Sequence, residues 1–381
     1  MKKRILVVSI VVLTIFISII AMSYNTNTPK TFTQDGVTYA LTLDGASINT
    51  FPSKGMYRVD VECSNATGKW LYDEWKLAVE DINGTNATCD VSFNTISTTY
   101  LNNYIIGLSG STQGTGQVVN ENGYRYEGKD PNNYIWFNNE LWRIIGVFDS
   151  SSHGVSGQNL VKIIRADSIG GLAWDKDGAN DWTQASLMNL LNGAYYNAQN
   201  GTGGEYCYGY STIVPGNCDY RESGINDIYR PMIKEVTWYL GGYSTSGWSI
   251  RLTAEGVYGY ERGSTVYSGR STSTEGYIGL MYPSDYAYSV LASSCARTLY
   301  LVEYSTVACA SQSWLYGKGN EFTITPSSSD SNDVFNVGSS GSLYFTTAGD
   351  GYAVRPVLYL DSSVYVIDGN GSMSDPYIIG M

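Results

Sequence analysis

The chain has 381 residues, and its 35 acidic residues outnumber the 23 basic ones to give a formal net charge of −12. Only 15% of the residues are charged. Nucleic-acid binding needs clustered Lys and Arg, so this balance argues against a nucleic-acid partner. The single histidine, His153, lies in a Ser- and Gly-rich stretch that predicts an exposed turn. One histidine excludes multi-histidine zinc sites and removes the usual base of most hydrolases.

The N-terminal segment predicts export. Three basic residues at positions 2–4 precede an apolar run over residues 5–22. The run is long for a signal peptide and just long enough to cross a bilayer as a helix. The positive flank would stay in the cytoplasm. We therefore expect residues 1–24 to be a signal or transmembrane anchor, with retention favoured over cleavage. The rest of the chain would lie at the extracellular face or be secreted, with membrane contact through this segment only.

The six cysteines form three pairs that are local in sequence. These pairs are Cys63 with Cys89, Cys207 with Cys218, and Cys295 with Cys309. None belongs to a Cys-x-x-Cys motif, and an even number behind an export segment is typical of disulfides in an oxidising compartment. The alternative is six reduced, buried thiols in a cytosolic protein.

Alternating side-chain character predicts a small β-sandwich domain over residues 25–96. Its strands are expected at residues 37–43, 57–63 and 88–93. A Cys63–Cys89 bridge would tie two of them in a domain too small to bury a large core. Residues 97–122 are rich in Ser, Thr, Gly and Asn and predict a linker. A larger domain would then occupy residues 123–381.

The larger domain is expected to be α+β. It opens with a predicted hairpin of residues 134–137 and 141–148, followed by a strand at 161–165. Two helices are predicted next, over residues 181–193 and 231–242, because each combines a start signal, an apolar stripe and a glycine stop. Asp181 would cap the first helix, with Gln184 completing a capping box, and Pro231 would lie in the first turn of the second. Short strands are expected afterwards at these positions: 257–263, 264–267, 277–282, 321–326, 334–337, 343–345 and 354–360.

The larger domain resembles an uncharacterised extracellular domain family of gut-associated, low-GC Gram-positive bacteria. The resemblance is carried by Trp-Leu at 314–315, Val-x-x-x-Gly at 337–341 and Val-Arg-Pro-Val at 354–357, with an opening strand at 142–147. That family is similar to the C-type-lectin-like fold, including the formylglycine-generating enzymes. The resemblance implies two helices followed by a twisted, looped antiparallel sheet.

The two activities known for that fold are not carried over to this sequence. The spacing of Cys295 and Cys309, ahead of the closing strand, suits a loop staple better than the reactive cysteine pair of the enzymes. The calcium and sugar motif of the lectins contains Trp-Asn-Asp, whereas residues 180–182 read Asn-Asp-Trp.

A cluster of oxygen donors after Trp174 is a candidate calcium site. Asp175, Asp177 and Asn180 offer carboxylate and amide oxygens around a turn permitted by Gly178. The spacing is not that of an EF-hand, and an ordinary solvated turn is the alternative. Beyond Ca²⁺ no cofactor is expected.

Two long stretches, residues 174–182 and 258–288, offer rings and charged groups that could bind a glycan or a surface protein. The candidate ligand-binding residues are Trp174, Trp182, Tyr258, Tyr260, Arg262, Tyr267, Arg270, Tyr282 and Asp285. The alternative is that the tyrosines pack as cross-strand pairs. Arg355, in an apolar strand, is expected to pair with a carboxylate.

These observations favour a non-catalytic binding or adhesion protein of the cell surface. An extracellular enzyme, of formylglycine-generating-like or glycan-acting type, is the first alternative. It would need converging carboxylates such as Glu255 with Glu261, or Glu303 with Asp285. A structural envelope protein is the second alternative.

Overall fold

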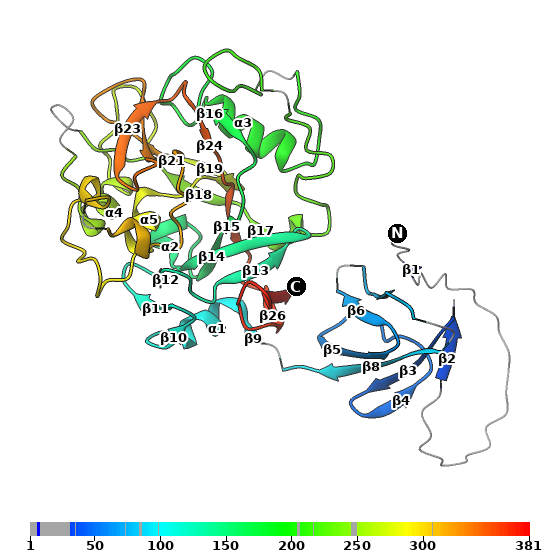
Figure 1. Cartoon of the computed structure of the whole chain (residues 1–381). Coiled ribbons are helices and arrows are strands. Elements are labelled where there is room, and N and C mark those ends of the chain that lie inside the picture. The colour runs from blue at the N-terminus through cyan, green and yellow to red at the C-terminus, as the bar shows by residue number, and fades with distance from the viewer. Residues whose placement is uncertain are drawn as a thin grey trace. The chain divides into compact units, whose positions relative to one another are not determined.

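The computed structural model describes residues 6–7, 31–34, 36–72, 74–83, 86–97, 99–203, 206–215, 217–244, 250–306 and 308–381. The chain divides into two compact units, Met1–Thr98 and Thr99–Met381 (Figure 1). Strands account for 38% of the structure and helices for 13%, so the fold is mostly β-sheet with a few helices, which is consistent with the predicted α+β class or with a mainly β class.

The first unit contains two sheets that share one hydrophobic core. The five-stranded sheet comprises β2 (Thr31–Gln34), β3 (Val37–Leu43), β4 (Ala46–Ile48), β5 (Tyr57–Ser64) and β8 (Ala87–Thr95). The three-stranded sheet comprises β1 (Leu6–Val7), β6 (Thr67–Leu71) and β7 (Lys76–Glu80). All three predicted strands are therefore present.

Strand β8 shows why this unit folds. Its side chains alternate between buried and exposed, so Val91 and Phe93 face the core while their neighbours face solvent. Cys63 and Cys89 lie opposite each other in the β5–β8 register and are bridged, with their Cα atoms 4.1 Å apart. Trp70 packs edge-on against Phe93 at 5.0 Å between ring centroids. The disulfide and the aromatic rings thus supply a core that so few residues would otherwise lack.

The predicted N-terminal anchor lies mostly outside the described residues. Within residues 1–24 only Leu6 and Val7 are described, and they form β1, which pairs with β7. Among the described residues, no helix is both long and apolar enough to span a bilayer.

The predicted linker at residues 97–122 is wrong from Thr99 onward. This stretch forms β9 (Thr99–Tyr100), α1 (Leu101–Gly107), β10 (Thr112–Gln113) and β11 (Gly116–Asn120). Leu101, Ile105 and Val118 are fully buried in the core of the second unit. The polar composition hid these three anchoring side chains, and the second unit therefore begins at Thr99.

The second unit is built on a twelve-stranded sheet, a five-stranded sheet and a two-stranded sheet. The largest sheet contains β9, β10, β11, β12 (Tyr124–Gly128), β13 (Tyr134–Phe137), β14 (Glu140–Phe148), β15 (Leu160–Arg165), β17 (Ile233–Lys234), β20 (Ile278–Gly279), β25 (Val357–Leu360), β26 (Tyr365–Asp368) and β27 (Tyr377–Gly380). The five-stranded sheet contains β16 (Gly171–Ala173), β21 (Glu321–Pro326), β22 (Asp333–Val337), β23 (Leu343–Thr347) and β24 (Gly351–Ala353). The two-stranded sheet pairs β18 (Val236–Tyr239) with β19 (Ser273–Gly276).

Strands β14, β15 and β25 form the centre of the largest sheet. β15 pairs antiparallel with both others, so that Ile163 lies opposite Ile144 on one side and Leu358 on the other. All three side chains are fully buried. Their near-continuous apolar runs are what a strand covered on both faces requires, and the sequence predicted these strands correctly. Arg355, just before β25, forms the expected buried ion pair with Glu321, at 2.7 Å.

The first predicted helix begins later than expected. α3 spans Ser186–Leu190 and continues as a π-helical turn over Leu191–Tyr195. Asp181 does not cap it; its carboxylate instead accepts from the amide and hydroxyl of Thr183 in a preceding turn. Gly193 lies inside the π-helical turn rather than after the helix.

The second predicted helix, residues 231–242, is wrong. Only a 3-10 turn, Arg230–Met232, is helical, and β17 and β18 follow it. Val236, Trp238 and Leu240 repeat every two residues, which is the period of a strand, and all three are buried. Proline and glycine at the ends delimit a segment without specifying its type.

Two further helices were not predicted, and α4 (Ala254–Glu261) replaces part of the strand expected at residues 257–263. α4 begins after Thr253, whose hydroxyl accepts from the Gly256 amide, and α5 (Pro283–Tyr288) has proline in its first turn. Residues 257–263 are rich in Tyr and Gly, so their intrinsic preference favours strand or turn, and tertiary packing overrides it. α2 (Ser150–His153) is a single short turn between β14 and β15.

Candidate functional site

The two predicted ligand-binding tryptophans are core residues. Trp174 and Trp182 are 0% and 1% exposed, and their rings pack together with centroids 4.9 Å apart. Trp174 Nε1 donates to the Thr323 carbonyl oxygen at 3.1 Å. Neither ring can reach a ligand, so this part of the predicted site is wrong.

The candidate calcium ligands do not converge. Asp175 accepts from the backbone amides of Asp177, Ala179 and Ser186, which makes it the organising residue of a turn. Asp177 points to solvent and pairs with Lys176. Asn180 is buried and uses its amide nitrogen on three main-chain carbonyl groups.

The remaining oxygen of Asn180 also argues against a bound cation. It accepts from the guanidinium Nε of Arg270 at 3.3 Å, so a positive charge already lies there. In the part of the chain that the structure describes, no group of three or more His, Cys, Asp or Glu side chains is arranged to bind a metal ion.

The second predicted stretch, residues 258–288, divides into two sets. Tyr260, Tyr267 and Arg270 reach the surface to different degrees; Tyr260 is 40% exposed and packs edge-on against Tyr243 at 4.9 Å. Arg270 instead connects this stretch to the 180s loop through Asn180 and Asp181. The other set, which includes Tyr282 and Asp285, is directed inward.

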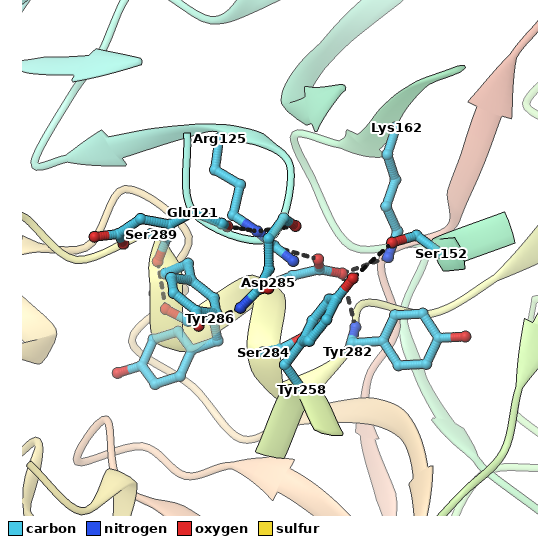
Figure 2. A network of polar contacts seen from close by, with 12 residues as sticks. Glu121, Arg125, Ser152, Lys162, Tyr258, Tyr282, Ser284, Asp285, Tyr286 and Ser289 are labelled. Atoms are coloured by element: carbon cyan, nitrogen blue, oxygen red, sulfur yellow. Dashed lines mark hydrogen bonds and ion pairs between the residues drawn. The ribbon is translucent and has the colours of Figure 1, made fainter. Parts of the chain in front are cut away.

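This inward set belongs to a buried ion cluster, shown in part in Figure 2. We define the cluster as Arg125, Lys162, Glu261, Arg262 and Asp285. Asp285 Oδ1 accepts from Arg125 Nη1 at 3.0 Å, and Asp285 Oδ2 accepts from Lys162 Nζ at 2.5 Å. Glu261 pairs with Arg262 at 2.9 Å and accepts from the Ser284 amide and hydroxyl. The sequence did not predict this cluster. Arg125 and Lys162 were not candidate site residues, and Glu261 was considered only as a possible glycosidase carboxylate.

Aromatic rings enclose these charges. The Lys162 ammonium lies 4.3 Å from the centroid of the Tyr282 ring, and the Arg262 guanidinium lies 3.7 Å from that of Tyr258. Phe148 covers Arg125 at 4.5 Å. Ring quadrupoles attract cations at such distances, and they compensate part of the hydration that the cluster has lost.

Burial and neighbouring charges act against each other on the pKa values in the cluster. Burial lowers the pKa of Lys162 to about 8, although Asp285 opposes the shift. Burial likewise raises the pKa of Glu261. Burial alone would also raise the pKa of the Asp285 carboxyl, but Lys162 and Arg125 outweigh it and lower this pKa.

The cluster is a structural network and not an open catalytic site. The side chains of Arg125, Lys162, Glu261 and Asp285 are at most 1% exposed. The proposed carboxylate pairs also fail as glycosidase sites, because Glu255 and Glu303 are exposed whereas Glu261 and Asp285 are enclosed. No sugar can approach both members of either pair.

A pocket of about 310 Å³ opens elsewhere in the second unit. Its walls come from the β13–β14 turn and from the chain around residues 198 and 221–226. The lining residues, which we call the polar pocket, are Asn138, Asn139, Glu140, Ala198, Arg221, Glu222, Ser223, Gly224 and Asn226.

Asn138 and Asn139 shape this pocket. Both have positive φ, 57° and 60°, which is the backbone of a two-residue hairpin turn that asparagine tolerates well. The Asn138 side chain is buried and fastens the opposite wall, because it donates to the Gly224 carbonyl at 3.0 Å and accepts from the Asn226 amide at 2.8 Å. Asn139 is exposed at the rim.

Glu140 supplies a fixed charge at the pocket. Its carboxylate accepts from Arg165 Nε through both oxygens, each at 2.8 Å, and from Trp142 Nε1 at 3.1 Å. Its charge adds to burial in raising the pKa of nearby Tyr195. The hydroxyl groups of Tyr195 and Tyr220 are buried and have no hydrogen-bond partner within the described residues.

The polar pocket was not predicted from the sequence. Residues 138–140 were predicted only as the connection between the two strands of a hairpin, and residues 221–226 carry no helix or strand pattern. The one sequence feature that could have indicated the pocket is the Asn-Asn-Glu turn, because it places two amides and a carboxylate together on a rigid hairpin. Nothing in the sequence indicates that residues 221–226 lie opposite it.

Comparison of the chain with protein-family profiles, with curated proteins and with solved structures gave no match.

Proposed function

We propose that this chain is a non-catalytic extracellular binding protein that takes a small polar ligand, such as one or two sugar residues of a glycan, in the polar pocket. The observation that carries the proposal is the pocket itself: about 310 Å³ of concave surface lined by amide, hydroxyl and carboxylate groups. Pockets of this size accommodate small ligands. Sugar hydroxyls both donate and accept hydrogen bonds, and Asn139, Ser223 and Asn226 offer matching groups.

The cellular setting supports this role. Three disulfides are present, at the three predicted pairs, and these suit an extracellular or secreted protein. Residues 1–24 would anchor the chain at the cell surface, as their charge and hydropathy indicate, although Leu6 and Val7 within them form β1 in this structure. A mainly β second unit with short helices and long loops supports a C-type-lectin-like arrangement, although one expected helix is a strand.

The same pocket favours binding over glycan hydrolysis. Glu140 is engaged by Arg165 and by the Trp142 indole, which leaves Glu222 as the one carboxylate of the lining without such partners among the described residues. Glycoside hydrolysis needs two cooperating carboxyl groups.

A glycan array probed with the exported chain tests the proposal, and titration calorimetry on the best ligand then measures its affinity. Asn139→Gly keeps the left-handed turn while removing the amide, and Ser223→Ala removes one hydroxyl. Each variant should weaken binding by roughly tenfold, the value of about one hydrogen bond.

Asn65→Gly is the matched control, because Asn65 also has a positive φ, 59°, but lies in the first unit. It should leave affinity unchanged. Binding that survives both pocket variants, or the absence of any glycan ligand, would show that the polar pocket is not a glycan site.

A further inference from the structure

The contact between Lys162 and Asp285 has the geometry of two groups placed to react. Lys162 lies on β15 and Asp285 on α5, 123 residues later in the chain. Their side chains are 1% and 0% exposed, and Nζ lies 2.5 Å from Oδ2. Around the ammonium stand four aromatic rings, those of Phe148, Trp238, Tyr282 and Tyr359, with centroids 4.3 to 5.8 Å away. Rings on this many sides exclude bulk water from the pair.

We propose that Lys162 and Asp285 condense into an intramolecular amide cross-link with the release of one water molecule, which makes them a self-modification site.

The reaction balances without any added reagent. A proton moves from the Lys162 ammonium to Asp285 Oδ2 along their hydrogen bond and leaves a neutral amine beside a neutral carboxyl group. The Nζ lone pair then attacks Cγ, the Cγ–Oδ2 bond breaks, and a second proton from Nζ leaves with Oδ2 as water. Oδ1 remains as the carbonyl oxygen of the new amide, and nothing is oxidised or reduced.

The neighbouring groups assist each bond change. Arg125 Nη1, 3.0 Å from Oδ1, is placed to stabilise the negative charge that develops on this oxygen when Nζ adds to Cγ. The Tyr282 amide donates to Oδ2 at 2.9 Å, which is the oxygen that departs (Figure 2). Burial lowers the pKa of Lys162 to about 8, so a neutral nucleophilic amine is more accessible than in an ordinary lysine.

Arg125 also opposes the first step. Together with Lys162 it lowers the pKa of Asp285, so the ion pair is the resting state and the neutral pair a minor form. Because the two groups share a hydrogen bond, a single proton transfer along it reaches the neutral pair. Condensation removes two buried charges, whose desolvation is costly, and the enclosed position leaves little water to reverse it.

Peptide mapping of the full exported chain after denaturation, reduction and alkylation tests the proposal. An acylated Lys162 resists trypsin, so peptide 144–165 should appear joined to peptide 271–297, lighter than their sum by one water molecule. Fragmentation of the joined species should place the bond at Lys162 and Asp285. Recovery of only the linear peptides 144–162 and 271–297, each at full mass, would overturn the proposal.

Two controls separate a specific reaction from chemical artefact. Lys234 and Asp361 also form a Lys–Asp pair, at 3.0 Å, but their side chains are 33% and 20% exposed. The peptide ending at Lys234 should therefore be released normally from the same digest. Lys162→Arg should abolish the joined peptide. A joined peptide that persists in this variant, or an equal amount of linkage at Lys234, would also contradict the proposal.

Discussion

The buried ion cluster and the polar pocket are made of the same kinds of side chains but differ in access to solvent. In the cluster, three cations and two carboxylates turn toward one another, and Glu261 and Asp285 are fully enclosed. In the pocket, Asn139, Arg221 and Asn226 face solvent, while Glu140 and Asn138 serve as the fixed frame. Charges that form ion pairs in the interior hold the fold together. Exposed polar groups on a rigid frame keep hydrogen-bonding capacity for a ligand.

The largest effect is expected inside the cluster. Asp285→Ala would leave Arg125 and Lys162 buried without their shared carboxylate, and breaking a buried pair costs about 3–5 kcal/mol. Chemical denaturation should show a loss of this size in the free energy of unfolding. The direction is the same whether the pair is ionic or joined as an amide. In the second case the variant also removes a cross-link between residues 123 positions apart, so the loss should be larger.

Asp361→Ala is the matched comparison, because it removes the carboxylate of the partly exposed Lys234 pair. Its cost should be about 1 kcal/mol, since water screens the charges. Equal losses in the two variants would mean that burial does not distinguish the cluster from a surface pair.

An intermediate effect on stability is expected at His153, a buried residue that does not belong to the ion cluster. It was predicted to be exposed but is fully buried in α2, where Nε2 bonds to the Phe148 carbonyl oxygen and Nδ1 accepts from the Val155 amide. Burial lowers its pKa below the ordinary 6.5. The unfolded chain therefore binds a proton below pH 6.5 that the folded chain does not, so this residue's contribution to stability falls as pH falls from 6.5 through the folded pKa.

For one proton, the free energy of unfolding cannot change by more than about 1.4 kcal/mol per pH unit. Because the chain has one histidine, its imidazole proton resonances can be followed by NMR without assignment ambiguity. His153→Asn should flatten the dependence of the melting temperature on pH between 5 and 6.5. A titration midpoint at or above 6.5 would contradict the buried, neutral state.

The smallest stability effect is expected in the polar pocket. Ser223→Ala and Asn139→Gly remove exposed groups, so the free energy of unfolding should change by less than about 0.5 kcal/mol while ligand affinity falls. Measuring both quantities on the same variants keeps recognition apart from folding. A loss of several kcal/mol in either variant would show that the pocket is part of the framework.

The candidate site was predictable only in fragments. Tyr258, Arg262, Tyr282 and Asp285 were selected as aromatic and charged loop residues, and they do come together, but around an enclosed cluster and not at a surface. Their partner Lys162 lies in an apolar strand, where the sequence pattern predicts only a core position. A single polar residue within such a run does not indicate which distant carboxylate it meets.

The sequence by itself determined the features that depend on near neighbours: the three local disulfides, the strands with clear apolar patterns at β3, β8, β14, β15 and β25, and the hairpin turn at Asn138 and Asn139. Cysteine spacing, side-chain alternation and turn chemistry act over a few residues, so each has one favourable local solution. Tertiary structure alone decided that residues 254–261 form a helix and that Asp285 meets Lys162. In these cases local preference is weak or contrary, and burial against elements more than a hundred residues away supplies the larger free energy.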